Sequence, residues 1–353
     1  MTIEAQKYIC ITPLDGLFFG KGRPFNMGED TWTDADLLPQ PGVVWGALFS
    51  QLWYRDRSTP LDALKIGRIF LMGENLTQLF LPAPLDIFQT DHGALCHHRF
   101  FWQDEKKYLL RAEGKNVLLK PETDEEVEPS EQKLMSVGSL RDYLGADRWF
   151  SAKIEAVDTY VKTELKIGLS RDPDRRAAAE GMLYTIRLSQ LAPGYRFVVE
   201  ADCSETLPEE GILKIGGEGK MAHFEVWSNT SEKGRVLKQM LSVSPPDDEV
   251  SFFKIYLTSP APLNRQGYPA FLDGKPFTVE AGVTGKPYLS GGFDLKAGRP
   301  KPKVMLAPAG SVYILEYTGD EGRCTAQKAK EYIGCGLNTR GFNQFEITPY
   351  YGN

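Results

Sequence analysis

FFKIYLTSPAPL, residues 252–263, decides the fold because it has the same pattern as YICITPLDGL at residues 8–17. Each stretch begins with alternating apolar residues, which are typical of a strand, and continues through Thr or Thr-Ser and Pro to Leu. A second pair of stretches, IGGEGKMAHFEV (215–226) and IGCGLNTRGFNQFEI (333–347), shares Ile-Gly, a second glycine, a basic residue and Phe-Glu. The two pairs indicate a duplicated unit that opens with a strand and ends with a glycine-rich loop leading into another strand.

Further helix and strand patterns lie between these ends. The apolar residues of VVWGALFSQLWYRDR (43–57) recur every four positions after Pro41, which predicts an amphipathic helix. GRIFLMG (67–73) and LTQLFLPAP (76–84) predict strands. In MLYTIRLSQLAPGYRFVVEAD (182–202) the alternation continues on both sides of Ala-Pro-Gly, which predicts a hairpin.

Length and composition favour two domains, because 353 residues with 42% hydrophobic content exceed the needs of one ordinary core. SVSPPDDEVS (242–251) is rich in proline and acid, so it is the expected linker. We expect an N-terminal domain over 1–245, with an insertion of variable order at about 86–160, and a C-terminal domain over 250–353. A strand-first unit with helices between its strands predicts an α+β, ferredoxin-like fold, whose free sheet face binds RNA in the RNA-recognition motif.

The charge distribution leaves room for a nucleic-acid partner. The net charge of -6 argues against a free-standing RNA-binding protein. However, PETDEEVEPSE (121–131) contains six acids and no base, and the rest of the chain is neutral overall. KAGRPKPK (296–303) has four bases and no acid, and VKTELKIGLSRDPDRR (161–176) has five bases and three acids. Local basic surfaces are therefore expected.

No stretch approaches the roughly 18 apolar residues that a membrane span requires, and the first twenty residues lack a signal-peptide pattern. We therefore expect a cytoplasmic protein without a membrane partner. The five cysteines are scattered and never spaced as C-x-x-C, so we expect reduced, mostly buried thiols and no zinc site.

Three segments combine glycine, a basic residue and phenylalanine: 18–28 (FFGKGRPFNMG), 215–226 and 333–347. Glycine permits close approach of the backbone, and Lys or Arg neutralises phosphate, which suits an RNA backbone. In the first segment Lys21 and Arg23 are the phosphate candidates. The same segment offers Phe25 for base stacking and Asn26 for a hydrogen bond to a base edge. The alternative is that its phenylalanines are core residues and Gly20-Lys21-Gly22 is a hairpin turn.

Two weaker candidates have structural alternatives. KAGRPKPK is either a basic strip for phosphates or a solvated loop that its prolines keep extended. In SRDPDRRAAAEG (170–181), Asp-Pro suits a helix start and Gly181 a helix end, and the first turn of this helix would expose three arginines. Those arginines are Arg171, Arg175 and Arg176, although an ordinary exposed alanine-rich helix explains the pattern equally well.

Catalysis has little support in the sequence. GGEGK (216–220) does not meet the P-loop pattern because Met221 follows the lysine. His97 and His98 supply the residue types of a ribonuclease acid-base pair, but adjacent residues on a strand point to opposite faces. The carboxylates of 121–131 are typical of a solvated segment rather than a metal site. We expect no enzyme activity, no cofactor and no metal.

In combination, these motifs resemble the third subunit of the Cmr complex, a family of the RAMP superfamily of CRISPR-associated RNA-binding proteins in type III-B systems. The matching motifs, in chain order, are GKGRPF (20–25), PGVVWGAL (41–48), LKIGLSRDPDRRAAAEGMLYTIRL (165–188), IGGEGK (215–220) and GGFDLKAGRPKPKVMLAPAGSVYIL (291–315), before the terminal glycine-rich loop. The resemblance covers nearly the whole chain and is weakest from about 86 to 160.

The resemblance implies two ferredoxin-like domains packed face to face, with glycine-rich loops at their junction and no catalytic activity. It also implies that the protein holds the 5′ repeat-derived tag of the CRISPR RNA, binds the large polymerase-cyclase subunit and adjoins the first backbone subunit, in antiviral defence. The residues that it assigns to RNA are Lys21, Gly22, Arg23, Phe25, Gly216, Gly217, Lys220, Arg340 and Asn343, with Arg171, Arg175, Arg176, Lys301 and Lys303 as weaker candidates.

Three alternatives stay open. A RAMP endoribonuclease that processes CRISPR precursor RNA would share the fold and need an acid-base pair. The equivalent subunit of the type III-A complex would have nearly the same role with different partners. A protein-docking module would use every glycine-rich loop for packing alone.

Overall fold

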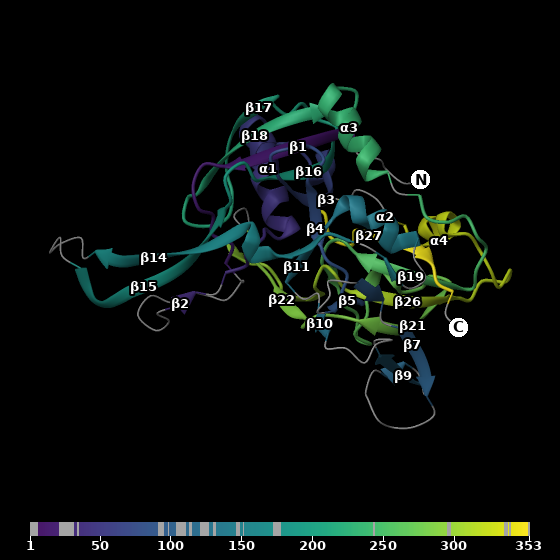
Figure 1. Cartoon of the computed structure of the whole chain (residues 1–353). Helices are drawn as coiled ribbons and strands as arrows, with labels where there is room; N and C mark the ends of the chain where they lie inside the picture. Colours follow the sequence, from purple (N-terminus) through teal and green to yellow (C-terminus); the bar gives the residue numbers. More distant parts are fainter. Residues whose placement is uncertain are drawn as a thin grey trace.

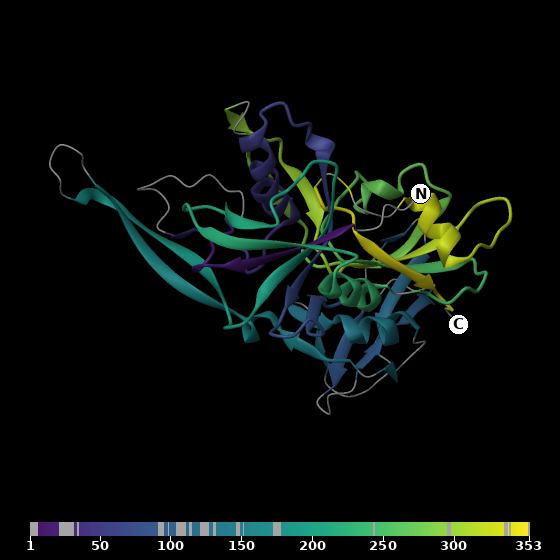
Figure 2. The same cartoon turned by 90° about the horizontal axis from the view of Figure 1, so that it is seen from above.

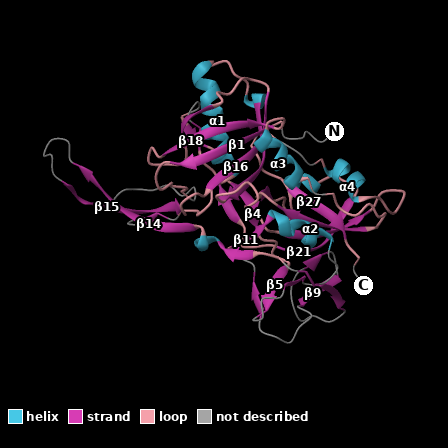
Figure 3. Cartoon of the chain, turned by 45° about the horizontal axis from the view of Figure 1, so that its top comes forward, coloured by secondary structure: helices cyan, strands magenta, loops and turns pink. Residues whose placement is uncertain are grey.

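The computed structural model describes residues 6–20, 32–33, 35–90, 95–97, 99–103, 111–112, 115–120, 127–129, 132–145, 149–150, 152–171, 178–242, 244–294, 298–334, 338 and 340–351. Strands predominate in this part of the chain, and short helices cover parts of the sheets (Figure 3). The strand ladders are antiparallel with one parallel exception, the pairing of β15 (Ala178–Leu191) with β2 (Trp32–Thr33). The predicted mixture of α and β elements with antiparallel sheets is confirmed.

An eight-stranded sheet forms the larger layer of the molecule. Its strands, in spatial order, are β13 (Ile154–Ala156), β11 (Lys133–Ser136), β4 (Leu79–Pro82), β3 (Leu64–Met72), β16 (Arg196–Cys203), β1 (Lys7–Pro13), β18 (Met221–Ser228) and β17 (Glu210–Lys214). The strands predicted at the N-terminus and at 67–73 and 76–84 are thereby confirmed. Two of its members, β11 and β13, come from the stretch predicted as an insertion.

Both faces of this sheet are buried, which explains the nearly continuous apolar run of β1. On one face Ile9 and Ile11 pack in the same cluster as α1 (Pro41–Arg55), whose Val44 and Leu48 are fully buried. The opposite face carries Tyr8 in a cluster with α2 (Val137–Gly145) and α3 (Glu232–Leu241). The helix predicted after Pro41 is confirmed, and the proline occupies its first turn, where no backbone N–H partner is needed.

A four-stranded sheet is built from the last hundred residues. Its order is β21 (Phe277–Val283), β26 (Val312–Tyr317), β19 (Phe252–Leu257) and β27 (Phe345–Pro349), and α4 (Ala326–Ile333) covers one face. The strand that follows each glycine-rich segment pairs with the opening strand of its unit: β18 with β1, and β27 with β19. Figure 1 shows this sheet beside the larger one, with α2 between their labels.

A long hairpin corrects two sequence predictions. β15 pairs with β14 (Val161–Arg171) from Val161↔Leu191 to Arg171↔Ala178, whereas β16 pairs with β1 and β3. The predicted hairpin over 182–202 is therefore wrong, although its turn at 192–195 is present. The helix predicted to end at Gly181 is also wrong, because residues 178–181 belong to β15. The β14–β15 hairpin extends away from the body of the molecule in both views (Figures 1 and 2).

Smaller elements complete the described chain. They are β5 (Ile87–Thr90), β6 (Leu95–His97), β10 (Val127–Pro129) and β12 (Trp149–Phe150) in one sheet, β7 (Arg99–Gln103), β8 (Arg111–Ala112) and β9 (Lys115–Lys120) in another, β20 (Ala261–Pro262), β22 (Tyr288–Ser290) and β25 (Val304–Ala307) in a third, the pair β23 (Phe293–Asp294) and β24 (Arg299–Pro300), and the 3-10 turns η1 (Leu61–Ala63), η2 (Val157–Thr159) and η3 (Ala270–Leu272). Of the cysteines, Cys10 and Cys324 are buried free thiols and Cys203 is half-buried, in agreement with the prediction for these three.

Buried charges join the two large sheets. The Arg68 guanidinium of β3 donates to both Glu200 oxygens, at 2.6 and 2.9 Å, and to Glu346 of β27 at 2.6 Å. At a second point Lys254 of β19 lies 3.2 Å from the Asp86 carboxylate, which also accepts a 2.8 Å hydrogen bond from the Tyr143 hydroxyl. Burial, followed by the charge of Asp86, raises the pKa of Tyr143 well above its ordinary value, so it stays a donor. Apolar packing and ionic bonds therefore both hold the sheets together.

Candidate nucleic-acid interface

The second glycine-rich segment, 215–220, packs directly against residues 15–20. Gly216 has φ of +74°, and a Cβ atom there would lie 2.3 Å from the backbone oxygen of Phe18. Gly217 donates its N–H to that same oxygen at 2.9 Å. A side chain at 216 is excluded by this contact, so the glycine is required for the close approach of two backbones. The segment therefore supports the start of the GKGRPF loop.

Lys220 is paired within the chain. Its Nζ donates to the Asp15 carboxylate, and its side chain is 11% exposed while that of Asp15 is 63% exposed. The hydrogen bonds from Lys220 and from the Gly16 backbone lower the pKa of Asp15, in that order of size. A phosphate that binds Lys220 would have to compete with Asp15, although the predicted assignment of Lys220 to RNA stays a prediction.

The ends of the first loop are held together. Gly20 and Ala35 form an antiparallel bridge, and the Asp36 N–H donates to the Phe19 oxygen at 2.8 Å. Phe19 is buried in the core, as the structural alternative for this segment predicts. Lys21, Gly22, Arg23, Phe25 and Asn26 lie outside the described residues, between these two closed ends.

The terminal glycine-rich segment packs on the other unit. Asn338 exchanges two backbone hydrogen bonds with Ile66 of β3, at 2.8 and 3.2 Å. Gly341 has φ of +72°, and a Cβ atom there would meet Ile66 at 2.8 Å. Arg340 is exposed, and its guanidinium carbon lies 5.6 Å from the centre of the Trp45 ring. Asn343 has φ of +62°, and its side-chain oxygen is buried without a hydrogen-bond partner among the described residues.

The basic strip 298–303 is the most open candidate among the described residues. Lys301 donates its N–H to the Gly292 oxygen at 2.8 Å, and the Lys303 side chain passes Gly291. Arg299 and Lys303 are exposed, and no ion pair within the described part of the chain involves them or Lys301. These side chains can bind an anion without breaking an internal pair.

One short stretch, residues 35–42, contacts the first and terminal glycine-rich segments, β15 and β22, and we call it the connecting segment. The backbone N–H of Asp36 donates to the Phe19 oxygen, and its backbone oxygen accepts a 3.1 Å hydrogen bond from the hydroxyl of Ser189 on β15. Its Gln40 accepts from Ser290 at 2.8 Å, one residue before Gly291. Its Gly42 faces the Phe342 ring, 3.5 Å from the position of an added Cβ atom. The connecting segment therefore links the first and terminal glycine-rich segments, and the second joins them through its own contact with Phe18. The basic strip is joined indirectly, because Gly291, which follows Ser290, meets the Lys303 side chain.

Of the three hairpin arginines, only Arg171 lies within the described residues. Arg171 ends β14 opposite Ala178 on the extended hairpin, and Arg175 and Arg176 are outside the described residues. Ser189, at the other end of β15, is the member of the hairpin that reaches the connecting segment. Residues 178–181, where the predicted helix would end, lie on β15, and its predicted first turn is outside the described residues.

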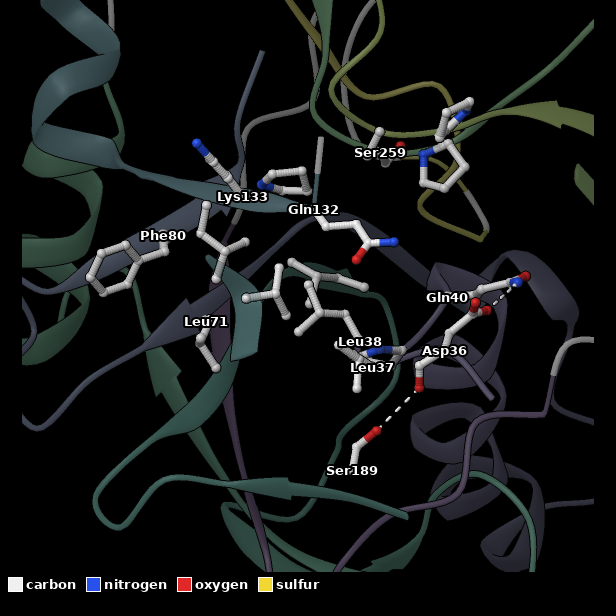
Figure 4. Close-up of a pocket in the computed structure, with 18 of the residues that line it drawn as sticks. Asp36, Leu37, Leu38, Gln40, Leu71, Phe80, Gln132, Lys133, Ser189 and Ser259 are labelled. Carbon is white, nitrogen blue, oxygen red and sulfur yellow. Dashed lines mark hydrogen bonds between the residues drawn. The ribbon is translucent and has the colours of Figure 1, made fainter. Parts of the chain in front are cut away.

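The connecting segment also lines a cavity of about 510 Å³ between the two large sheets (Figure 4). Asp36, Gln132 and Ser259 come to it from separate parts of the chain. Sequence analysis missed this cavity, because Asp36 and Gln132 stand in no motif and the sequence separation of the three residues hides their proximity.

No helix in the described ranges is long and apolar enough to cross a membrane. Within the same part of the chain, no group of three or more His, Cys, Asp or Glu side chains is placed to hold a metal ion. His97 lies on β6, and its side chain and all of His98 are outside the description.

Known proteins with a similar fold come from CRISPR effector complexes. A chain of the type III-B Cmr-beta complex, solved with cognate target RNA and AMPPnP, is 16% identical, with a TM-score of 0.51 over 87% of this chain and 86% of its own. A chain of the Csm3–Csm4 subcomplex of the type III-A interference complex is 12% identical, with a TM-score of 0.38 over 90% of this chain and 96% of its own. No curated protein matches the chain in sequence.

The family model for CRISPR-associated protein Cas_Cmr3 matches residues 9–346. This match spans both large sheets and all three glycine-rich segments. The chain therefore belongs to the Cas_Cmr3 family of CRISPR-associated proteins. The resemblance to the third subunit of the Cmr complex, predicted from five motifs, is confirmed.

Proposed function

We propose that this chain is a non-catalytic CRISPR RNA-binding subunit of a type III-B effector complex, which holds the 5′ repeat-derived tag of the guide RNA in the cytoplasm. The observation that carries the proposal is a chain of contacts in a member of the Cas_Cmr3 family. The connecting segment contacts the first and terminal glycine-rich segments, the second glycine-rich segment packs on Phe18, and the basic strip lies next to Ser290, which bonds to Gln40. A single-stranded tag needs such a surface, with close backbone approach, cations for phosphates and polar groups for splayed bases.

The proposed architecture is two ferredoxin-like domains, over 1–245 and 250–353, with an insertion at about 86–160 in the first. Two strand orders support it: β18-β1-β16-β3 in the first unit and β27-β19-β26-β21 in the second. In each, the fourth strand in sequence lies beside the first, followed by the third and the second. Helix α1 separates the first two strands of one unit, and α4 separates the last two of the other, in keeping with a β-α-β-β-α-β pattern.

The proposed partners follow the family's effector complexes. They are the CRISPR RNA tag, the large polymerase-cyclase subunit and the adjacent backbone RAMP subunit. The similar Cmr-beta chain comes from a complex bound to target RNA, which supports an RNA partner for this chain as well. The net charge of -6 implies that neighbouring subunits supply part of the positive surface, so the isolated chain should bind RNA weakly.

Replacing Arg23 tests the phosphate contact of the first loop. If Arg23 neutralises one phosphate, Arg23→Ala in the assembled complex should reduce the slope of log K against log salt concentration by about 0.7. The measurement is tag-RNA binding at several salt concentrations, with Arg323→Ala, on an exposed turn before α4, as the matched control. An unchanged slope in Arg23→Ala would remove this residue from the interface.

The absence of catalysis needs its own test. Incubating the wild-type protein with CRISPR precursor RNA should leave the RNA intact. Cleavage that disappears in a His97→Ala, His98→Ala double variant would replace the proposal with a processing endoribonuclease that uses the two imidazoles as acid and base.

A further inference from the structure

The cavity between the two large sheets has the size of a ligand site. Its volume is about 510 Å³, within the range of roughly 300–1,000 Å³ that is usual for small-molecule pockets. Leu38, Leu71, Phe80, Pro82, Pro260 and Pro308 supply much of its apolar wall. Such walls suit a flat, weakly polar group, such as a nucleobase.

A buried hydroxyl lines this cavity without a hydrogen-bond partner. Thr258 is only 4% exposed, and its Oγ1 has no hydrogen-bond partner among the described residues. Its backbone is fixed, because its N–H donates to the Gln344 oxygen at 2.9 Å. An unsatisfied buried hydroxyl is unfavourable, so Thr258 is a hydrogen-bonding group that the protein leaves unpartnered in the cavity wall.

Gln132 is the second polar group, and its backbone is held in an unfavourable conformation. Its φ is +57°, in the left-handed region that non-glycine residues rarely adopt. The Val157 N–H donates to its carbonyl oxygen at 3.0 Å. In Figure 4 its side-chain amide points into the open space, towards Asp36 and Gln40. An amide offers one donor and one acceptor side by side, the pattern that pairs with an adenine edge.

Charged groups complete the lining. Lys133, Arg187 and Lys286 supply positive charge, and the Asp36 carboxylate accepts a 3.0 Å hydrogen bond from Gln40. The cations suit a phosphate. The cavity therefore combines apolar walls, hydrogen-bonding groups for a base edge and cations for a phosphate.

We propose that this cavity takes up one unstacked nucleotide of the bound RNA, with adenine as the preferred base. The base lies between the apolar walls, with its edge towards Gln132 and Thr258, and its phosphate is next to the lining cations. This inference rests on the proposed RNA-binding function and adds the place where one base is read. The connecting segment forms both the cavity lining and the junction of the glycine-rich loops, so a strand bound at those loops can turn one nucleotide into the cavity.

The test uses the assembled complex and a set of tag RNAs in which 2-aminopurine replaces each base in turn. Enclosure of one base should change the fluorescence at one position only. Ala309→Phe fills the cavity from a half-buried position, and Gln132→Ala removes the amide. Each should abolish that change and weaken binding of an RNA with adenine at this position by about tenfold or more.

Two controls separate the inference from a loss of folding. Gln327→Ala removes an amide on the exposed face of α4 that bonds only to Glu331 in the described chain, and it should behave as wild type. Unfolding curves of Ala309→Phe and Gln132→Ala confirm that each variant is folded. If the folded variants keep the position-specific signal and the affinity, the inference is overturned while the proposed function stands.

Two further outcomes are decisive. If the wild-type complex binds the tag without any contact from this chain, the proposed function fails and the inference fails with it. The second outcome compares the binding of free AMP with the binding of the RNA. If AMP binds in a Gln132-dependent manner while no RNA position responds to Ala309→Phe, the cavity is a mononucleotide site, and the proposal of an RNA nucleotide is overturned.

Discussion

Arg68→Met is expected to lower the free energy of unfolding by about 3–5 kcal/mol, because it leaves buried carboxylates without their cation. Arg68 bonds to Glu200 and Glu346, whose side chains are 10% and 8% exposed. Lys330, 3.3 Å from Glu346, compensates only that one of the two acids. The loss should appear in urea unfolding curves as a lower midpoint.

An exposed lysine provides the matched control. Lys328 pairs with Glu321 on the surface, and such exposed pairs contribute about 0–1 kcal/mol. Lys328→Met should therefore leave the unfolding midpoint nearly unchanged. Equal losses in the two variants would contradict the view that Arg68 joins the two sheets through buried charge.

Gly216→Ala is expected to have the largest effect of any single change in the glycine-rich segments. The added Cβ atom would lie 2.3 Å from the Phe18 oxygen, so the backbone contact between 215–220 and 15–20 has to open. We expect a loss of about 2–4 kcal/mol, from the left-handed φ of +74° together with the forced shift. Tag-RNA affinity in the assembled complex should fall with it, because the GKGRPF loop loses its support.

Gly219→Ala separates the effect of the left-handed backbone from the effect of the contact with Phe18. Gly219 has φ of +64°, but an added Cβ atom would meet nothing within 4 Å. Its replacement should cost only the conformational term, about 1–2 kcal/mol, and should leave RNA affinity near the wild-type value. If both variants lose equal stability and affinity, the contact with Phe18 does not support the loop.

Local patterns predicted the elements that are fixed by burial and by the repeated strand–loop–strand signature. Helix α1 and strands β1, β3 and β4 follow directly from apolar periodicity. The repeated segments correctly indicated that each unit opens with a strand, β1 or β19, and that a strand, β18 or β27, follows its glycine-rich segment. These predictions use local patterns or the similarity between two parts of the chain, so a single sequence is sufficient to make them.

Strand partners were harder to predict. The alternation in β15 is real, and a turn follows it, but β16 lies centrally between β1 and β3 instead of returning along β15. The central position of β16 could have been predicted from RFVVEADC (196–203), because this stretch lacks alternation. A strand that is buried on both faces typically has a continuous apolar run. The alanines at 177–179 favour a helix by propensity, but Ala178 pairs with Arg171 in the hairpin, and tertiary pairing overrides propensity.

The candidate site was predicted only in part for the same reason. Glycine at 216 serves a close backbone contact that only glycine permits, but the sequence analysis assigned this role to the approach of an RNA backbone and not of Phe18 in the same chain. The ion pair that engages Lys220 depends on Asp15, which is far away in sequence and belongs to a strand pattern that gives no sign of this contact. The cavity depends on residues such as Gln132 and Thr258, which only the packing of two sheets brings together.

The most direct test of the RNA-binding account is photo-cross-linking of the assembled complex to a CRISPR RNA with a photoreactive base in its 5′ tag, followed by peptide mapping. We expect cross-linked peptides from 18–28, from 215–223 and from 333–345. The connecting segment contacts the first and the last of these stretches, and the second packs on Phe18 of the first. Cross-links confined to partner subunits would contradict the account, since the glycine-rich loops would then serve only to pack this chain as a scaffold.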